Sequence, residues 1–185
     1  MNKRLTPGLL CALACMAQPV RAHEPGAHVH GMAELRVAID APQLEISLES
    51  PLDNVLGFEH APRDDKQRAA VRVMAARLRQ AQTLFVPTPA AHCRLTTVQL
   101  ASAALPADLL GEKPAASPEA SHDADGHADL DATFTFSCAA PSLLKGMDVD
   151  LMQAFAGFHK INVSVAGPAG QSSVVLTPGT RTVRW

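Results

Sequence analysis

Two short runs in which apolar and polar residues strictly alternate constrain the fold of this chain more than any other feature. Apolar side chains occupy every second position in residues 35–39 (LRVAI) and again in residues 44–48 (LEISL). Alternation with a period of two places these side chains on one face of an extended strand. The intervening residues 40–42 (DAP) are typical of a tight turn. The pattern therefore predicts a β-hairpin with one buried face and one wet face.

Further periodic segments follow the hairpin. Helical spacing of apolar residues predicts one helix from Asp64 to a point before Pro87 and a second over about residues 141–156. Additional strands are predicted at residues 93–100, 130–138, 160–165 and 172–176. This order predicts an α+β fold with a mostly antiparallel sheet and two helices. It also allows two pseudo-repeated β/α halves that share one core, although no repeat of individual residues is visible.

The segment at about residues 103–129 differs in composition from the rest of the chain. It is rich in Ala, Pro, Ser, Asp and His and has few large apolar side chains. Because such a segment has little to bury, we predict a flexible insertion between two strands.

The N-terminal residues have the layout of a secretory signal peptide. A basic start precedes an apolar stretch at residues 9–16 that is too short to span a bilayer, and cleavage after residue 22 would leave His23 first. A lipoprotein signal at Cys15 is the less favoured alternative, because the leucine before it stands at −2 rather than −3. We therefore predict a signal peptide at residues 1–22, export to a Gram-negative-type periplasm, and one mature domain at residues 23–185 without a transmembrane segment.

Two of the four cysteines, Cys93 and Cys138, belong to the predicted mature chain. In an oxidising compartment an even pair predicts a disulfide. Closing a loop of about 45 residues contributes about 4 kcal/mol when the effect is treated as chain entropy. The alternative is a nucleophilic Cys93 activated by His92, which is disfavoured because sequence neighbours on a strand face opposite sides.

Charge and motif content argue against two classes of function. Removing the signal takes the basic residues from 16 to 13 against 18 acidic residues, which is a net charge of −5 with neutral histidines. Such a chain is poorly suited to a polyanion such as DNA. The sequence also has no HExxH, GxSxG, P-loop or GxGxxG motif and no tyrosine. We therefore predict neither an enzyme nor a nucleic-acid binder.

The strongest candidate for chemistry is an HVHG motif that supplies His28 and His30. In an extended chain, side chains two residues apart share a side about 7 Å apart, so two imidazoles can converge on one zinc ion. Zinc needs further ligands, and Glu59 and His60 in a predicted loop are the obvious donors. His159 is a further candidate. For the HVHG motif the alternative is a solvated N-terminal arm or processing remnant without a ligand role. For Glu59 and His60 the alternative is a solvated helix entry or a hydrogen-bonded core histidine.

A second, weaker set of candidate ligands lies in the predicted insertion. These residues are His122, Asp123, Asp125 and His127. Deprotonated imidazole and carboxylate on a loop suit weak, rapid capture of zinc. An EF-hand calcium loop is excluded, because Ala128 and Phe134 stand where it needs Gly and Glu. A solvated linker is equally compatible with this composition.

Several longer motifs resemble the ZrgA-type zinc-uptake family, formerly classed as a domain of unknown function. The motifs are HVHGMAELRVAI, LEISLESPLDNVLGFEHAP, FTFSCAAP, FAGFHKINVSV and QSSVVLTP, and they span essentially the mature chain. The resemblance implies a periplasmic protein that helps zinc reach an uptake system and carries a histidine-rich insertion. It places ligands at His28, His30 and the GFEH motif that ends in Glu59 and His60. The insertion here has only two histidines, which argues against a high-capacity buffer.

Residues and resemblance together predict a periplasmic zinc-binding accessory protein for zinc uptake or homeostasis. Zn²⁺ is its expected ligand, and components of a zinc uptake transporter are its expected partners. One alternative is copper binding by an N-terminal His23, whose free amine and imidazole can chelate copper. Another is a structural periplasmic module whose histidines have no metal role.

Overall fold

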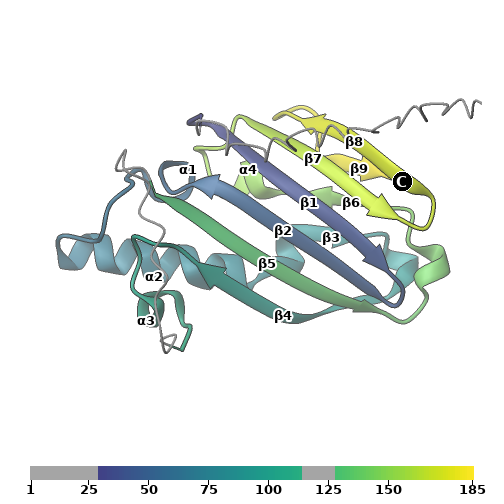
Figure 1. Ribbon diagram of the computed structural model, residues 1–185, viewed down its shortest axis with the longest axis horizontal. Coiled ribbons are helices and arrows are strands. Elements are labelled where there is room, and N and C mark those ends of the chain that lie inside the picture. Colours follow the sequence, from purple (N-terminus) through teal and green to yellow (C-terminus); the bar gives the residue numbers. More distant parts are fainter. Residues whose placement is uncertain (1–28, 114–127) are drawn as a thin grey trace, which may run out of the picture.

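The computed structural model describes residues 29–113 and 128–185, which are built around a six-stranded sheet (Figure 1). The strand order across this sheet is β4-β5-β2-β1-β7-β8. The bounds are β1 Met32–Asp40, β2 Gln43–Pro51, β4 Cys93–Ala101, β5 Asp129–Cys138, β7 Lys160–Gly167 and β8 Gly170–Leu176. The predicted signal peptide and the 114–127 part of the predicted insertion lie outside the described residues.

Strands β1 and β2 form the predicted hairpin. Their antiparallel register sets Val37 opposite Ile46, and both side chains are buried. The polar residues of the same strands point to the open face, where Arg36 contacts Glu49 at 2.9 Å. The alternation in the sequence thus corresponds to one buried and one wet face.

The large sheet is mixed because β1 has neighbours of both orientations. It pairs in parallel with β7, from Met32 opposite Lys160 to Ala38 opposite Ala166. The other neighbouring strands of this sheet pair antiparallel. The α+β class and the mostly antiparallel pairing are therefore confirmed, whereas the two pseudo-repeated halves stay a prediction.

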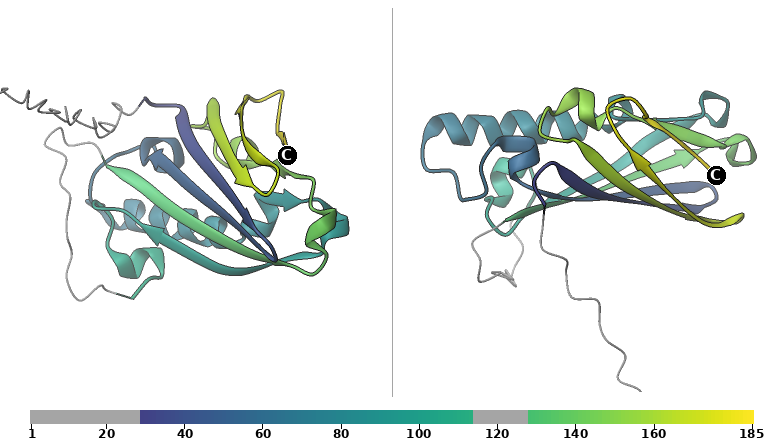
Figure 2. Two further views of the ribbon diagram at one scale, coloured as in Figure 1. Left: turned by 45° about the vertical axis from the view of Figure 1, so that its right-hand side comes forward. Right: turned by 90° about the horizontal axis from the view of Figure 1, so that it is seen from above.

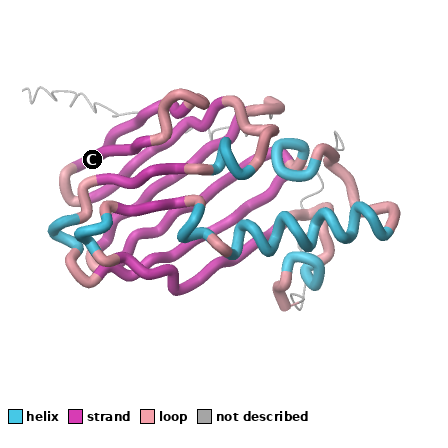
Figure 3. Tube along the Cα trace, turned by 180° about the vertical axis from the view of Figure 1, so that it is seen from behind, coloured by secondary structure: helices cyan, strands magenta, loops and turns pink. Residues whose placement is uncertain are grey.

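One face of the large sheet is covered by helix α2 and by a second, smaller sheet (Figures 2 and 3). The smaller sheet has the order β3-β6-β9, with β3 at Phe85–Pro87, β6 at Gly146–Val149 and β9 at Thr182–Arg184. The core lies between these layers. The remaining helices are single turns: α1 Asp53–Leu56, α3 Ala107–Leu110, α4 Leu151–Ala154, and 3₁₀ turns at Ala81–Thr83, Pro89–Ala91 and Pro141–Leu143.

Helix α2 spans Asp65–Arg79 and corresponds to the first predicted helix. Asp64 caps it by accepting a hydrogen bond from the amide of Gln67 at 2.8 Å, which satisfies one of the free donors of the first turn. The helix ends at Arg79, before Pro87 as predicted, and the following residues turn into β3. None of the helices in the described residues is long and apolar enough to cross a membrane.

The second predicted helix, residues 141–156, is wrong. This stretch contains a 3₁₀ turn, strand β6 and the single-turn helix α4. Gly146 in β6 packs so tightly that a Cβ there would lie 2.3 Å from the carbonyl oxygen of Val183 in β9. The apolar residues have helical spacing, but pairing with β3 and β9 holds residues 146–149 extended, and Leu143 remains 48% exposed.

Cys93 and Cys138 form the predicted disulfide. They face each other in the register of β4 and β5, and the bond closes a sequence separation of 45 residues. The turn between β1 and β2 lies at the same end of the sheet, because the amide of Cys138 donates a hydrogen bond to the carbonyl of Pro42. A disulfide fits an exported protein.

The predicted insertion begins with ordered structure. Leu105, Leu109 and Leu110 are buried, so this part has more to bury than its composition indicates. The guanidinium of Arg79 donates to the carbonyl oxygen of Leu110 at 2.9 Å and contacts Glu112, which fixes α3 against α2.

Candidate metal site

The candidate ligands of the described residues gather at the end of the sheet opposite the disulfide. There β1 and β7 begin, β2 ends, and α1 follows β2 (Figure 1). Each of these strands is about nine residues long, so the two ends of the sheet are about 30 Å apart.

A turn brings His30 to the start of β1. The amide of Met32 donates a hydrogen bond to the carbonyl of Val29 at 3.0 Å, and Gly31 has φ +82°. A positive φ of this size at the third position is that of a type II turn, which favours glycine. The chain thus turns into β1 at Gly31, and because His28 lies outside the described residues, an extended run from His28 to His30 stays a prediction.

The backbone of Gly31 is held by the segment that leads into β7. Its carbonyl oxygen accepts hydrogen bonds from the amides of His159 at 2.8 Å and Lys160 at 3.0 Å. A Cβ at this position would lie 2.7 Å from Cδ2 of His159. His159 is thus packed directly against the turn, and a side chain larger than glycine would collide with its ring.

Asn54 of α1 links the turn to the rest of the site. This residue is 3% exposed. Its Oδ1 accepts from the amide of Gly31 at 2.6 Å, and its Nδ2 donates to the carbonyl of Met32 at 2.8 Å and to Oγ of Ser50 at 3.0 Å. A Cβ on Gly157 would lie 2.4 Å from the carbonyl oxygen of Asn54. Helix α1 is therefore clamped between the turn and the segment before β7.

The side chain of His30 lies between two carboxylates. Its Nε2 is 3.0 Å from Oε1 of Glu59, and its Nδ1 is 3.8 Å from Oδ2 of Asp53. The side chain of Glu59 is only 13% exposed, whereas those of His30 and Asp53 are 55% and 38% exposed. The turn supplies the imidazole, α1 one carboxylate, and the loop after α1 the other.

This spacing suits a bound cation. Two zinc ligands with tetrahedral geometry and bonds of 2.0–2.2 Å have their donor atoms about 3.4 Å apart. Nε2 of His30 and Oε1 of Glu59 are 3.0 Å apart, so an opening of a few tenths of an ångström gives the required separation. Zinc would be held by Nε2 of neutral His30 and by the carboxylate of Glu59. Asp53 would face the other ring nitrogen, as a carboxylate that orients a metal-bound histidine does.

The structure does not bring His60 and His159 into the same cluster as His30. Nδ1 of His60 is 2.9 Å from the carbonyl oxygen of Ala61, and its ring stacks on Phe58 at 5.1 Å between centroids. Donation from Nδ1 to that carbonyl leaves Nε2 as the nitrogen with a lone pair. Within residues 29–113 and 128–185, no three His, Cys, Asp or Glu side chains surround a common metal position. His23, His28 and the candidates at 122–127 lie outside the described residues.

Comparison with known families adds a second line of evidence. The family model of the ZrgA family zinc uptake protein matches residues 27–185. The chain belongs to the ZrgA family of zinc uptake proteins. A search of curated proteins finds no match. A zinc-uptake-related role is therefore supported by nearly the whole of the predicted mature chain.

Three of the motifs that resemble the ZrgA family meet at this one end of the sheet. The HVHG motif ends in Gly31, the LEISLESPLDNVLGFEHAP motif contains Asn54 and Glu59, and the FAGFHKINVSV motif contains Gly157 and His159. Their contacts connect segments more than a hundred residues apart in the sequence. Three of the five motifs thus contribute residues that hold the turn beside His30 in place.

Asp53 is the residue of this cluster that sequence reasoning missed. It stands directly before Asn54 in the quoted LDN motif, but one acidic residue at the start of a short helical turn gives no signal of its own. Its neighbour Asn54 determines its position. The side chain of Asn54 binds the turn at Gly31, and this contact brings Asp53 close to His30.

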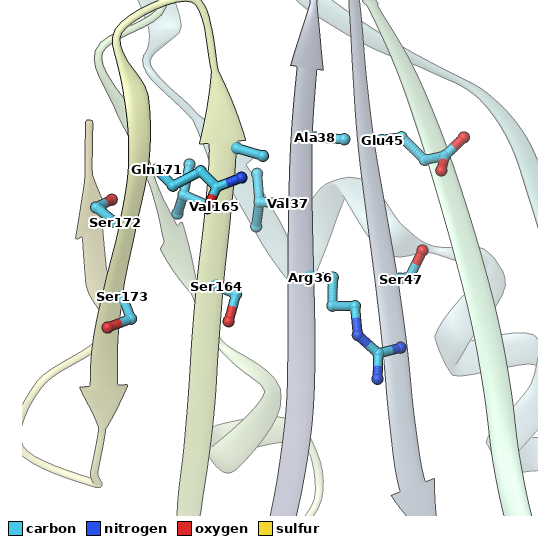
Figure 4. A pocket seen from close by; sticks show the side chains of 11 residues that line it. Arg36, Val37, Ala38, Glu45, Ser47, Ser164, Val165, Gln171, Ser172 and Ser173 are labelled. Carbon is cyan, nitrogen blue, oxygen red and sulfur yellow. The ribbon is translucent and has the colours of Figure 1, made fainter. Parts of the chain in front are cut away.

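A hollow on the surface lies elsewhere, on the open face of the large sheet. It has a volume of about 640 Å³ and is lined mainly by small and polar side chains. Figure 4 shows these side chains on neighbouring strands, with Arg36 and Ser47 beside each other. Its lining includes no histidine, so this hollow is not the candidate metal site of this ZrgA family member.

Proposed function

We propose that this chain is a periplasmic zinc-binding accessory protein that captures zinc and passes it to an uptake system. Family membership supports a role in zinc uptake. The observation that carries the zinc-binding part is the contact of 3.0 Å between Nε2 of His30 and Oε1 of Glu59, with Asp53 on the other side of the ring. The disulfide supports an oxidising compartment.

The proposed ligands are His28, His30, Glu59 and His60. Glu59 is well placed to be a retained ligand, because its side chain is largely buried and lies next to His30. His60 would contribute through Nε2 after its ring moves toward His30. Asp53 would hold the ring of His30 in the orientation that presents Nε2 to the metal.

Weaker capture would use side chains beyond this cluster. We propose this role for His23, His122, Asp123, Asp125 and His127. Transfer is then a ligand exchange in which zinc passes from these exposed groups to the structured ligands and from there to a component of a transporter. Because His30 and Asp53 are partly exposed, a partner can approach the site without unfolding it.

Zinc titration tests the structured site. Isothermal titration of the tag-free chain from residue 23 should give a dissociation constant below about 10 μM, and His30→Asn and Glu59→Gln should each weaken it at least about tenfold, or 1.4 kcal/mol. The matched control is His92→Asn, since His92 is an exposed histidine at the disulfide end with φ 50°, which asparagine tolerates. Wild-type binding weaker than 10 μM, or unchanged affinity in both site variants, would rule out the proposal.

The orienting role of Asp53 has its own test. Asp53→Asn keeps the shape of the side chain but removes its charge, so zinc affinity should fall about tenfold, as for other residues that support a metal ligand. Asp65→Asn is the control, because Asp65 is a 99% exposed carboxylate at the start of α2. Equal zinc affinity in Asp53→Asn and wild type, measured by the same titration, would exclude Asp53 from the site.

A further inference from the structure

The two edges of the large sheet differ in how their backbone groups are protected. Exposed edge strands offer unpaired N–H and C=O groups to other chains, and proteins usually block them with charges, prolines, bulges or covering segments. Strand β4 forms one edge and β8 the other (Figure 1). Within residues 29–113 and 128–185, only β4 carries such protection.

The β4 edge is covered. A β-bulge interrupts its pairing with β5. The carbonyl of Val98 accepts a hydrogen bond from Arg79 at 3.4 Å, and the amide of Leu100 donates to Glu112 at 3.0 Å. Side chains from α2 and from the segment after α3 thus occupy backbone groups that another strand would otherwise use.

The β8 edge has none of these features in the part of the chain that the structure describes. Its sequence, GQSSVVL, contains no charged residue and no proline, and its pairing with β7 runs without a bulge from Ile161 opposite Leu176 to Gly167 opposite Gly170. Among the described residues, the backbone groups of β8 that face away from β7 have no hydrogen-bond partner. Residues 170–173 are exposed, and Val175 is 48% exposed.

We propose that two copies of this chain pair through antiparallel β8 strands, with Ser173 on the two-fold axis. An isologous contact requires a surface that complements itself. In this register Gln171 faces Val175 of the second copy and Ser172 faces Val174, so no charge is repeated across the axis and no bulky pair collides. A partner strand with charged side chains would form no ion pairs with β8, which carries no charge. The paired sheets would form one continuous sheet with a shared open face.

The proposed interface is small. Each copy contributes one strand of seven residues, which is well below the area of a standard stable interface. The dimer should therefore dissociate in the micromolar range, and its population should depend on concentration.

The test introduces charged side chains at two positions of one row of residues that face each other across the open face of the sheet. The row, with one residue per strand, is Gln99, Thr133, Ser47, Arg36, Ser164 and Ser173. Ser173→Lys places two like charges across the axis, and so does Ser173→Glu, whereas an equimolar mixture of the two places opposite charges there. Gln99→Lys puts the same charge in the same row at the protected edge and serves as the control.

Sedimentation velocity in metal-free buffer provides the measurement, at chain concentrations from about 1 to about 200 μM, where an interface of this size dissociates. Wild type and Gln99→Lys should pass from monomer to dimer. Each Ser173 variant alone should dissociate at least about tenfold more readily, and their mixture should recover the dimer. A wild type that stays monomeric, a Ser173→Lys variant that dimerises like wild type, or a mixture that stays monomeric would each overturn the proposal.

Discussion

Replacing Asn54 with leucine should lower the free energy of unfolding by about 3 kcal/mol, because three polar groups lose a partner in a buried place. These groups are the amide of Gly31, the carbonyl of Met32 and the hydroxyl of Ser50. Leucine has the branched outline of asparagine and is larger, so none of the loss comes from a cavity. Urea unfolding followed by circular dichroism measures the change.

If zinc binds at the proposed site, the Asn54→Leu variant should also bind zinc more weakly. Without Asn54, α1 is no longer tied to the turn, so Asp53 and His30 lose their fixed relation. Asn162→Leu is the matched control, since Asn162 also makes a side-chain hydrogen bond, to Glu34, but on the exposed face. We expect that control to change the stability by less than about 1 kcal/mol. An Asn54→Leu variant as stable as wild type would show that the clamp described here does not hold the fold.

Breaking the Cys93–Cys138 disulfide should cost up to about 4 kcal/mol of unfolding free energy, since the crosslink restricts a loop of 45 residues in the unfolded chain. Zinc affinity of the folded protein should stay the same. The disulfide joins β4 and β5 at the end of the sheet opposite His30, about 30 Å away. Unfolding of oxidised and reduced wild type in metal-free buffer measures the first effect.

A double variant separates the crosslink from other effects of the reductant. Cys93→Ala with Cys138→Ala should resemble the reduced wild type in stability, and added reductant should not change it. Zinc titration of this variant, under conditions in which it is folded, should match the oxidised wild type. A large drop in affinity would mean that the two ends of the sheet are coupled.

The parts of the fold that were predicted correctly are those with local signals. The β1–β2 hairpin is visible from alternation and a turn, and α2 from helical spacing that begins at a capping residue, Asp64. The disulfide follows from cysteine number and the expected compartment. In each case the pattern that decides the structure lies within a short stretch of sequence or in a simple count.

The errors arise where contacts between residues far apart in the sequence determine the local structure. Residues 146–149 have apolar spacing that suits a helix, yet β3 and β9 hold them as the middle strand of a small sheet. The parallel pairing of β1 with β7 joins Met32 to Lys160, and no local pattern indicates it. Leu109 and Leu110 lie in a stretch of small and polar residues, so their burial was also missed.

In the candidate site, too, the residues with a signal in the sequence were predicted, and the residue whose position depends on a distant contact was missed. His30 and Glu59 were predicted as partners from residue type and resemblance, and the structure brings their side chains to 3.0 Å. Their binding of zinc stays a prediction. Asp53 was missed because its place depends on the docking of α1 through Asn54, which is a contact across 23 residues.

The parallel pairing of β1 with β7 also sets an order of events. Gly31, next to His30, takes its backbone hydrogen bonds from His159 and Lys160, which belong to the last thirty or so residues of the chain. A polypeptide that emerges with its N-terminus first presents His30 and Asn54 early, but the carbonyl of Gly31 gains its two hydrogen bonds only after residues 159 and 160 have followed. The turn that carries His30 would therefore reach its full set of contacts only after β7 has paired with β1.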